Sequence, residues 1–263
     1  MKKIATTILL SLSLAGGLWA QKPISSWNNN QVVAHRGAWK AKGLPENSIA
    51  SLKEAIRMKC HGSEFDVHLT ADSVLVVNHD PVFMGMPIAQ STYAQLLTKK
   101  HPNGESIPTA EAYLRAGKKQ KGTKLILEIK LQNMGAEHDL YLTQRCLDLV
   151  RQLKCEAWVE YISFGYNVCQ YLVAHAPGAP VQYLNGDVPP EKLQADHISG
   201  IDYHYSVFLK NDWVAPAKKL GITLNAWTVN EAADMDRLLG QGFDYITTNE
   251  PGLLFERIKA QGK

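Results

Sequence analysis

Short β-branched runs alternate with longer stretches of helical spacing, and this alternation constrains the fold more than any other feature of the chain. Parallel strands joined by crossover helices give such a pattern. Nine strand-like runs occur among the 263 residues. They are Val32–His35, Ser63–His68, Val74–Asn78, Leu125–Lys130, Val159–Phe164, Val181–Leu184, Ile198–Tyr203, Ile222–Trp227 and Tyr245–Thr247. We therefore expect an α/β protein with a mostly parallel sheet.

Two of these runs lie too close together to be parallel neighbours. Only residues 69–73 separate the second run from the third, whereas a parallel crossover needs about a dozen residues or more. One of the two must be a hairpin arm, which leaves eight strands, the number in a closed β/α barrel. We predict an irregular TIM-type (β/α)8 barrel. Its early part, from about Asp80 to Gly122, should hold a small excursion and a helix at Thr109–Ala116.

Helical spacing of apolar residues predicts two further helices, at Ser48–Met58 and Asn230–Leu239. Ser48 has a hydroxyl suited to capping the first helix. Asn230, ahead of an acidic residue in the first turn, is expected to cap the second. No linker or internal repeat divides the chain, so we expect one domain.

Residues 1–20 have the parts of a secretory signal peptide: Lys2 and Lys3, an apolar run over Ile8–Leu14, and small residues ending at Ala20. We expect cleavage there, a mature single domain spanning residues 21–263, and export to the periplasm or the medium. A retained N-terminal anchor is the alternative. No later apolar stretch reaches the roughly 18 to 20 residues that a membrane span needs, so stable membrane insertion is not expected.

Composition argues against a nucleic-acid partner. The formal charge of +3 falls to +1 once Lys2 and Lys3 are removed, and the sequence lacks the stripe of Lys and Arg that nucleic-acid binders carry. The four cysteines form neither a CxxC motif nor a zinc signature, and their pairing stays open, as does the oligomeric state. These cysteines are Cys60, Cys146, Cys155 and Cys169.

Two histidines follow predicted strands: His35 closes the first run and His79 the third. Barrel enzymes expose their active sites at strand ends. A single histidine there is often only a packed imidazole. A pair can divide proton abstraction from proton donation near neutral pH, so we propose His35 and His79 as an acid–base pair.

Three carboxylates also fall on predicted strands. Glu64 and Asp66 project to the same side of their strand, and Glu128 interrupts an apolar run near another strand's end. Buried carboxylates need a compensating cation. Oxygen ligands without cysteine favour one hard divalent ion, Ca²⁺ or Mg²⁺. The alternative is that Glu128 simply pairs with Lys130.

Arg36 and Lys130 complete a phosphate-binding pattern. A phosphodiester carries negative charge that grows in its transition state, and a guanidinium can hold two of its oxygens at once. Lys130 and the metal ion would stabilise the remaining charge.

Five motifs then occur in order: Ala34-His35-Arg36-Gly37, Pro45-Glu46-Asn47-Ser48, Glu64-Phe65-Asp66-Val67, His79-Asp80 and Leu127-Glu128-Ile129-Lys130. Together they resemble the glycerophosphodiester phosphodiesterase family. The likeness continues through Ile162-Ser163-Phe164 and Ala226-Trp227-Thr228-Val229-Asn230 to Tyr245-Ile246-Thr247-Thr248. It therefore covers nearly the whole mature chain.

The resemblance implies an irregular β/α barrel of the phospholipase-C-like phosphodiesterase type. It also implies metal-dependent hydrolysis of glycerophosphodiesters, as small-molecule substrates, to glycerol 3-phosphate and an alcohol. By position, the histidine pair performs acid–base catalysis, the three carboxylates hold the ion, Arg36 and Lys130 contact phosphate, and Glu46 supports them. In this family the substrate's own neighbouring hydroxyl is thought to attack phosphorus, giving a cyclic phosphate that water opens. Which histidine begins as the base stays open.

Two positions carry open alternatives and one stretch departs from the family. His204, in the stretch Ile201–Tyr205, lines the substrate pocket or belongs to an ordinary polar loop. Trp227 is a floor beneath glycerol or sugar, or a packed rim aromatic. The family usually has Asp after the last Ile-Thr pair, where this chain reads Thr248-Asn249-Glu250-Pro251. We expect this departure to lie outside the metal and proton-transfer groups.

Three other functions remain as alternatives. A related barrel phosphodiesterase would act on phosphoinositides, lysophospholipids or sugar-linked phosphodiesters with the same histidines. An exported binding protein would keep the phosphodiester site without turnover. A glycosidase using Glu64 and Glu128 as paired carboxylates would leave both histidines without a role.

Overall fold

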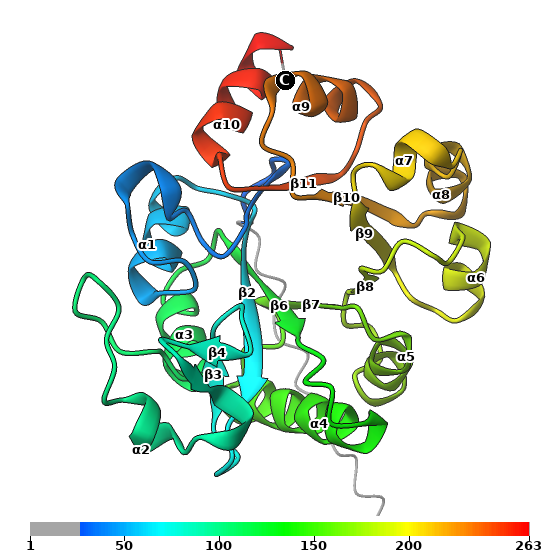
Figure 1. Cartoon of the computed structure of the whole chain (residues 1–263). Helices are drawn as coiled ribbons and strands as arrows, with labels where there is room; N and C mark the ends of the chain where they lie inside the picture. The colour runs from blue at the N-terminus through cyan, green and yellow to red at the C-terminus, as the bar shows by residue number, and fades with distance from the viewer. Residues whose placement is uncertain (1–26, 263) are drawn as a thin grey trace, which may run out of the picture.

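The computed structural model describes residues 27–262, so the expected signal peptide lies outside the described residues. Within this range eight parallel strands close into a barrel, since β1 pairs with both β11 and β2. The strands are β1 (Val32–Ala34), β2 (Gly62–Leu69), β6 (Lys124–Ile129), β7 (Val159–Ser163), β8 (Val181–Tyr183), β9 (Gly200–His204), β10 (Thr223–Trp227) and β11 (Tyr245–Thr248). Figure 1 shows helices placed around them. The predicted TIM-type barrel is confirmed.

The ninth predicted run is the hairpin arm. β3 (Leu75–Val77) pairs antiparallel with the end of β2, so that Val67 faces Val77. β2 is eight residues long and extends past the pairing of β1, and β3 returns along this extension. The backbone N–H of Asn78 donates to the carbonyl of Asp66 at 3.1 Å. The chain therefore reaches His79 beside the mouth of the barrel.

Helices follow the barrel strands, and all but the last, α10, lie between two of them in the chain. They are α1 (Ile49–Arg57), α3 (Ala110–Gly117), α4 (Ala136–Leu153), α5 (Tyr166–His175), α6 (Pro190–Ala195), α7 (Val207–Lys210), α8 (Val214–Leu220), α9 (Ala232–Gly240) and α10 (Pro251–Ala260). The predicted excursion after Asp80 contains β4 (Val82–Phe83), β5 (Met86–Pro87) and α2 (Tyr93–Leu96). Five buried side chains give it a small core of its own: Val76, Phe83, Ile88, Leu96 and Ile107.

Side-chain alternation along the strands separates two apolar clusters. The large one lies between strands and helices, where outward residues of β6 such as Leu125 and Leu127 pack. The inward residues Val33, Ile126, Ile162 and Leu184 form a second cluster. Because Glu64, Asp66 and Glu128 share the inward side, this second cluster provides an apolar base for a polar site.

The predicted cap at Ser48 and the predicted helix start at Thr109 are confirmed. The Ser48 hydroxyl accepts from the Ser51 N–H at 3.0 Å, and the Thr109 hydroxyl accepts from the Ala112 N–H at 3.0 Å. The prediction for Asn230 is wrong, because α9 begins after Glu231. The amide oxygen of Asn230 accepts instead from the backbone N–H of Asn249 at 2.9 Å, which joins the loops after β10 and β11.

The four cysteines are all free, buried thiols. Burial raises the pKa of Cys60 to about 12. Within residues 27–262, no helix combines the length and apolar character that crossing a bilayer requires.

Candidate active site

The first strand ends in a tight turn that positions two polar residues. Arg36 has a φ of 57° and Gly37 a φ of 80°, both in the left-handed region. A Cβ atom at Gly37 would lie 2.5 Å from the Ser51 hydroxyl oxygen, so only glycine fits there. The turn directs the backbone N–H of Arg36 to Glu64 Oε2, at 2.7 Å.

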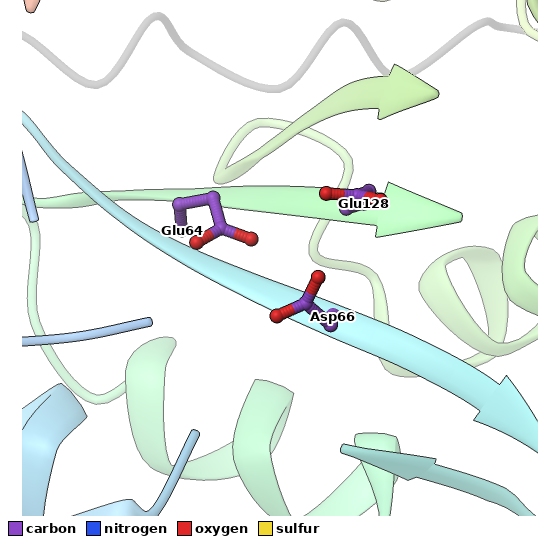
Figure 2. A group of neighbouring side chains, drawn as sticks. All are labelled: Glu64, Asp66 and Glu128. Atoms are coloured by element: carbon purple, nitrogen blue, oxygen red, sulfur yellow. The ribbon is translucent and has the colours of Figure 1, made fainter. Parts of the chain in front are cut away.

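Neighbouring strands bring the three predicted carboxylates together. β2 and β6 pair in parallel, with Asp66 opposite Glu128, and Glu64 lies two residues earlier on the same side. Figure 2 shows the three carboxyl groups converging on a shared space. One oxygen from each lies within 4.8 Å of the others. All three residues are at most 7% exposed, so their charges are removed from water.

Positive groups compensate this cluster only in part. Lys130 Nζ lies 2.8 Å from Glu128 Oε1 and 3.1 Å from Asp66 Oδ1. Burial opposes ionisation of Asp66, but Lys130, followed by other partners, outweighs it and lowers the pKa of Asp66 to about 2. Burial and then the neighbouring Asp66 raise the pKa of Glu128 to about 8. Burial, followed by both other carboxylates, raises the pKa of Glu64 well above its ordinary value.

These residues fit a divalent cation. Glu64 Oε1 is buried and has no hydrogen-bond partner among the described residues. The donor set consists of carboxylate oxygens, which hard ions such as Ca²⁺ and Mg²⁺ prefer. Two carboxylates that resist ionisation for lack of positive charge indicate that a cation would relieve their repulsion. The structure thus brings the three predicted metal ligands together in a site suited to one divalent cation.

His35 lies beside the three carboxylates, and its two ring nitrogens have different neighbours. Nδ1 is 2.8 Å from Asn249 Oδ1, and Nε2 is 4.0 Å from Glu64 Oε2. Burial, followed by Arg36, lowers the pKa of His35 to about 4, which keeps the imidazole neutral at pH 7. The expectation that the Thr248–Pro251 departure lies outside the proton-transfer groups is therefore wrong. The parallel pairing of β1 with β11 brings Asn249 directly to His35.

His79 reaches the same mouth from the hairpin. Its Nδ1 lies 2.7 Å from Asp80 Oδ1, and its backbone carbonyl is 3.0 Å from His68 Nε2. The side chain of His79 is 33% exposed, so this imidazole faces solvent more than His35 does.

Arg36 is oriented by Glu46. Its Nη1 donates to both carboxylate oxygens of Glu46 at 3.0 Å, and its Nε lies 3.9 Å from Asp66 Oδ2. The Nε atom is buried and makes no hydrogen bond to any described residue. Glu46 thus holds the guanidinium through one nitrogen and leaves another for a ligand.

One pocket of about 190 Å³ unites most of these groups. Its lining comprises His35, Arg36, Glu64, His79, Glu128, Lys130, Ile162, Phe164, Leu184, Asp202, Trp227, Thr228 and Thr247. Trp227 thus lies in the pocket wall. Neither Glu46 nor His204 is part of the lining. The His204 ring contacts Trp227 instead, with ring centroids 5.3 Å apart.

Among the pocket residues that the sequence prediction missed, Asp202 is the one with an ionisable side chain. It lies on β9 and is 1% exposed. Burial, followed by Glu128, raises its pKa well above the ordinary value. The available signal was an acidic residue inside the apolar run Ile198–Tyr203, flanked by Ile201 and Tyr203.

Comparisons of the sequence and of the structure with known proteins all identify glycerophosphodiester phosphodiesterases as similar. The family model of the "Glycerophosphoryl diester phosphodiesterase family" matches residues 35–253. The crystal structure of a glycerophosphodiester phosphodiesterase from Parabacteroides distasonis is similar, with a TM-score of 0.86 and 38% identity, over 90% of this chain and 100% of that one. A glycerophosphodiester phosphodiesterase of Caldanaerobacter subterraneus is 26% identical over 88% of this chain and 98% of its own length. A phosphodiesterase from Oleispira antarctica, solved with the product sn-glycerol-3-phosphate, shares the fold, with a TM-score of 0.72 and 23% identity over 88% and 97% of the two chains.

Proposed function

This chain belongs to the glycerophosphoryl diester phosphodiesterase family, and we propose that it hydrolyses glycerophosphodiesters to glycerol 3-phosphate and an alcohol. One observation carries the proposal. Groups suited to binding phosphate and moving protons line a single pocket at the barrel mouth together with Glu64 and Glu128, two of the three carboxylates suited to holding a cation. The family relationship gives the substrate class, and the pocket supplies groups for each part of the reaction.

The proposed catalyst is metal-dependent. A Ca²⁺ or Mg²⁺ ion held by Glu64, Asp66 and Glu128 would supply positive charge for the phosphate oxygens and for the additional charge of the transition state. The carboxylates support this, since oxygens of all three lie within 4.8 Å of one another, and Lys130 pairs with only two of them, Asp66 and Glu128.

Arg36 and Lys130 are proposed to bind the non-bridging phosphate oxygens. Arg36 is held by Glu46 through Nη1, so its Nε and the remaining N–H groups keep a fixed direction. Lys130 lies between two carboxylates, and its ammonium group stays protonated because Asp66 and Glu128 outweigh its burial and raise its pKa. A fixed guanidinium and a fixed ammonium stabilise developing negative charge without reorganising.

His35 and His79 are proposed to move the protons. In the first step the glycerol 2-hydroxyl oxygen forms a bond to phosphorus, and one imidazole takes its proton. The bond from phosphorus to the alcohol oxygen breaks, and the other imidazole gives that oxygen a proton. In the second step water opens the cyclic phosphate with the two roles reversed. Asn249 and Asp80 each hold one ring nitrogen, so the other nitrogen of each ring is left for the substrate.

We also propose that the protein is exported. The support is the composition of residues 1–20, with Lys2 and Lys3 before the apolar run and small residues ending at Ala20. Fractionation of the producing cells and N-terminal sequencing of the mature protein test this. A cytoplasmic protein that keeps Met1 would contradict it.

The activity is tested by product analysis on four substrates with each ion in turn: glycerophosphocholine, glycerophosphoethanolamine, glycerophosphoglycerol and glycerophosphoinositol. Glycerol 3-phosphate should form from at least one of them with Ca²⁺ or Mg²⁺ and disappear with chelator. Lysophosphatidylcholine and a sugar-linked phosphodiester belong in the same panel. Hydrolysis of these alone would favour a related phosphodiesterase, and binding without hydrolysis of any substrate would favour a non-catalytic protein.

A further inference from the structure

Asp202 lies across the pocket from the acidic cluster. Around the barrel, β9 is four strands from β2 in either direction, so Asp202 faces the wall that carries Glu64 and Asp66. It shares the pocket lining with both proposed proton-transfer histidines. A phosphate bound near the cluster would therefore have one of its substituents directed towards β9.

No hydrogen bond within the described residues explains why the carboxyl group of Asp202 is buried. Its Oδ1 is buried and has no hydrogen-bond partner among them. The adjacent Asn225 is engaged elsewhere, because its Nδ2 donates to the Thr247 hydroxyl at 3.0 Å and its Oδ1 accepts from the Ala226 N–H at 2.8 Å. A buried polar group without a partner costs free energy, because it has lost its hydrogen bonds to water and gained none in the protein. A ligand that supplies the partner would recover that cost.

The surroundings of Asp202 restrict what this ligand group can be. The neighbouring pocket wall is apolar, formed by Ile162, Phe164, Leu184 and Trp227. The Trp227 indole N–H is already used, since it donates to the backbone carbonyl of Asp202 at 2.8 Å. A short carbon chain bearing one hydroxyl matches a wall with a single polar group. The pKa of Asp202, raised by burial, agrees with a neutral partner such as a hydroxyl.

The in-line geometry of the proposed reaction indicates which substituent of phosphorus, the glycerol or the alcohol, lies in the pocket. The attacking and leaving oxygens lie on opposite sides of phosphorus, so glycerol and the alcohol point in opposite directions. A pocket of about 190 Å³ suits the three-carbon glycerol, and an alcohol of variable size needs the open side. The glycerol 2-hydroxyl must meet an imidazole, which leaves the terminal hydroxyl for the far wall.

We propose that Asp202 binds the terminal hydroxyl of the substrate's glycerol and so determines specificity for glycerol over other phosphate substituents. This inference rests on the proposed function and identifies the residue that recognises one part of the substrate. The interaction is a hydrogen bond, so it should govern binding of glycerol 3-phosphate as well as of the intact diester.

The test compares two competitive inhibitors, sn-glycerol 3-phosphate and 1,2-propanediol 1-phosphate, which lacks the terminal hydroxyl. In Asp202→Leu the inhibition constant of glycerol 3-phosphate should rise about ten- to hundredfold. That of the propanediol phosphate should change less than about twofold. Asp202→Asn, which keeps hydrogen-bonding groups, should restore part of the difference. Leu184→Ala, in the same wall, should affect both inhibitors by the same factor.

Each other outcome overturns the inference in its own way. Equal weakening of both inhibitors in Asp202→Leu would make Asp202 a residue that only shapes the pocket. A higher KM for glycerophosphocholine, with glycerol 3-phosphate inhibition unchanged, would place Asp202 beside the ammonium of the alcohol group. If the wild-type protein hydrolyses no glycerophosphodiester and binds no glycerol 3-phosphate, the proposed function fails first.

Discussion

His35 Nδ1 lies 2.8 Å from the amide oxygen of Asn249. An acceptor at this distance keeps the proton on Nδ1 and leaves Nε2 as the nitrogen that faces the pocket. The amide carries no charge, so its hydrogen bond favours the imidazolium form too weakly to offset burial and Arg36, which keep the pKa of His35 low. A carboxylate at the same place would favour the imidazolium form more strongly. Asn249 therefore orients His35, and the chemical type of the residue at position 249 tunes the pKa of the imidazole.

Asn249→Asp should raise the pKa of His35, since an adjacent anion favours the protonated ring. The limb of the kcat/KM profile that His35 controls would then move to higher pH by about one unit or more. This sign holds whether His35 acts first as base or as acid. The check is a pH–rate profile at saturating ion for wild type, Asn249→Asp and Asn249→Leu. Two superimposable profiles for wild type and Asn249→Asp would mean that the contact has no electrostatic role.

His35→Ala and His79→Ala should each lower kcat at least about a hundredfold, because each removes one proton carrier. Both side chains line the pocket and neither belongs to an apolar cluster of the described residues, so the far-ultraviolet circular dichroism and melting temperature should change little. His175→Ala is the matched control. His175 is exposed at the end of α5, where its Nδ1 lies 2.8 Å from the carbonyl of Tyr171 and its ring stacks on the Tyr171 ring in the same helix. Near-normal turnover in either pocket variant would disprove the acid–base assignment.

Ca²⁺ or Mg²⁺ should raise the melting temperature, because an ion that binds the folded state alone stabilises it by mass action. Chelation should remove activity reversibly. Glu64→Gln should abolish both the thermal shift and the activity, since it removes the negative charge of a ligand whose Oε1 has no hydrogen-bond partner among the described residues. Calorimetry with and without the ion measures the shift in the absence of substrate.

Glu160→Gln is the control for the metal prediction. Glu160 is also a buried carboxylate, on β7, but its cationic neighbour is Lys124 at 3.8 Å. This variant should change the melting temperature of the ion-free protein and keep the full ion-induced shift. Loss of the shift in Glu160→Gln as well would show that it reflects general charge effects.

The sequence was sufficient for those site residues whose positions follow from strand periodicity. Alternation places Glu64 and Asp66 on one side of β2, and the parallel pairing of β2 with β6 sets Asp66 opposite Glu128. His79 was predicted from a partly mistaken premise. Its strand is antiparallel, so its end reaches the mouth only because β2 extends past β1 and β3 returns along that extension.

Contacts between distant loops could not be predicted in this way. Asn249 meets His35 because β11 and β1 close the barrel, which joins residues 214 positions apart. Asp202 can be identified as a candidate ligand-binding residue only once the structure shows that the pocket wall around it is apolar. Asn230 has a sequence typical of a helix cap, but its side chain finds a better-placed donor in Asn249. Local sequence propensity does not predict hydrogen bonds between side chains and backbone groups that are distant in the sequence.

The ion pairs of Glu54, which lie outside the candidate active site, predict that the protein loses stability in acid. Glu54 accepts from Arg57 at 2.6 Å and 2.8 Å and from Lys42 at 2.7 Å. The Arg57 hydrogen bond, with Lys42 also contributing, lowers the pKa of Glu54 from 4.5 to about 2. A lowered pKa stabilises the fold above pH 4.5, and this contribution disappears as the pH falls towards 2.

Glu54→Gln should therefore lower the free energy of unfolding at pH 7 by roughly 1 to 2 kcal/mol, a figure reduced because both partners are half-exposed or more. The gap from wild type should close as the pH falls to about 2. Urea unfolding between pH 7 and pH 2 with chelator present measures it. Glu111→Gln removes an exposed pairing with Arg115 on α3 and should cost less than about 0.5 kcal/mol at any pH. A gap for Glu54→Gln that persists near pH 2 would mean that lost packing, rather than lost charge, destabilises the variant.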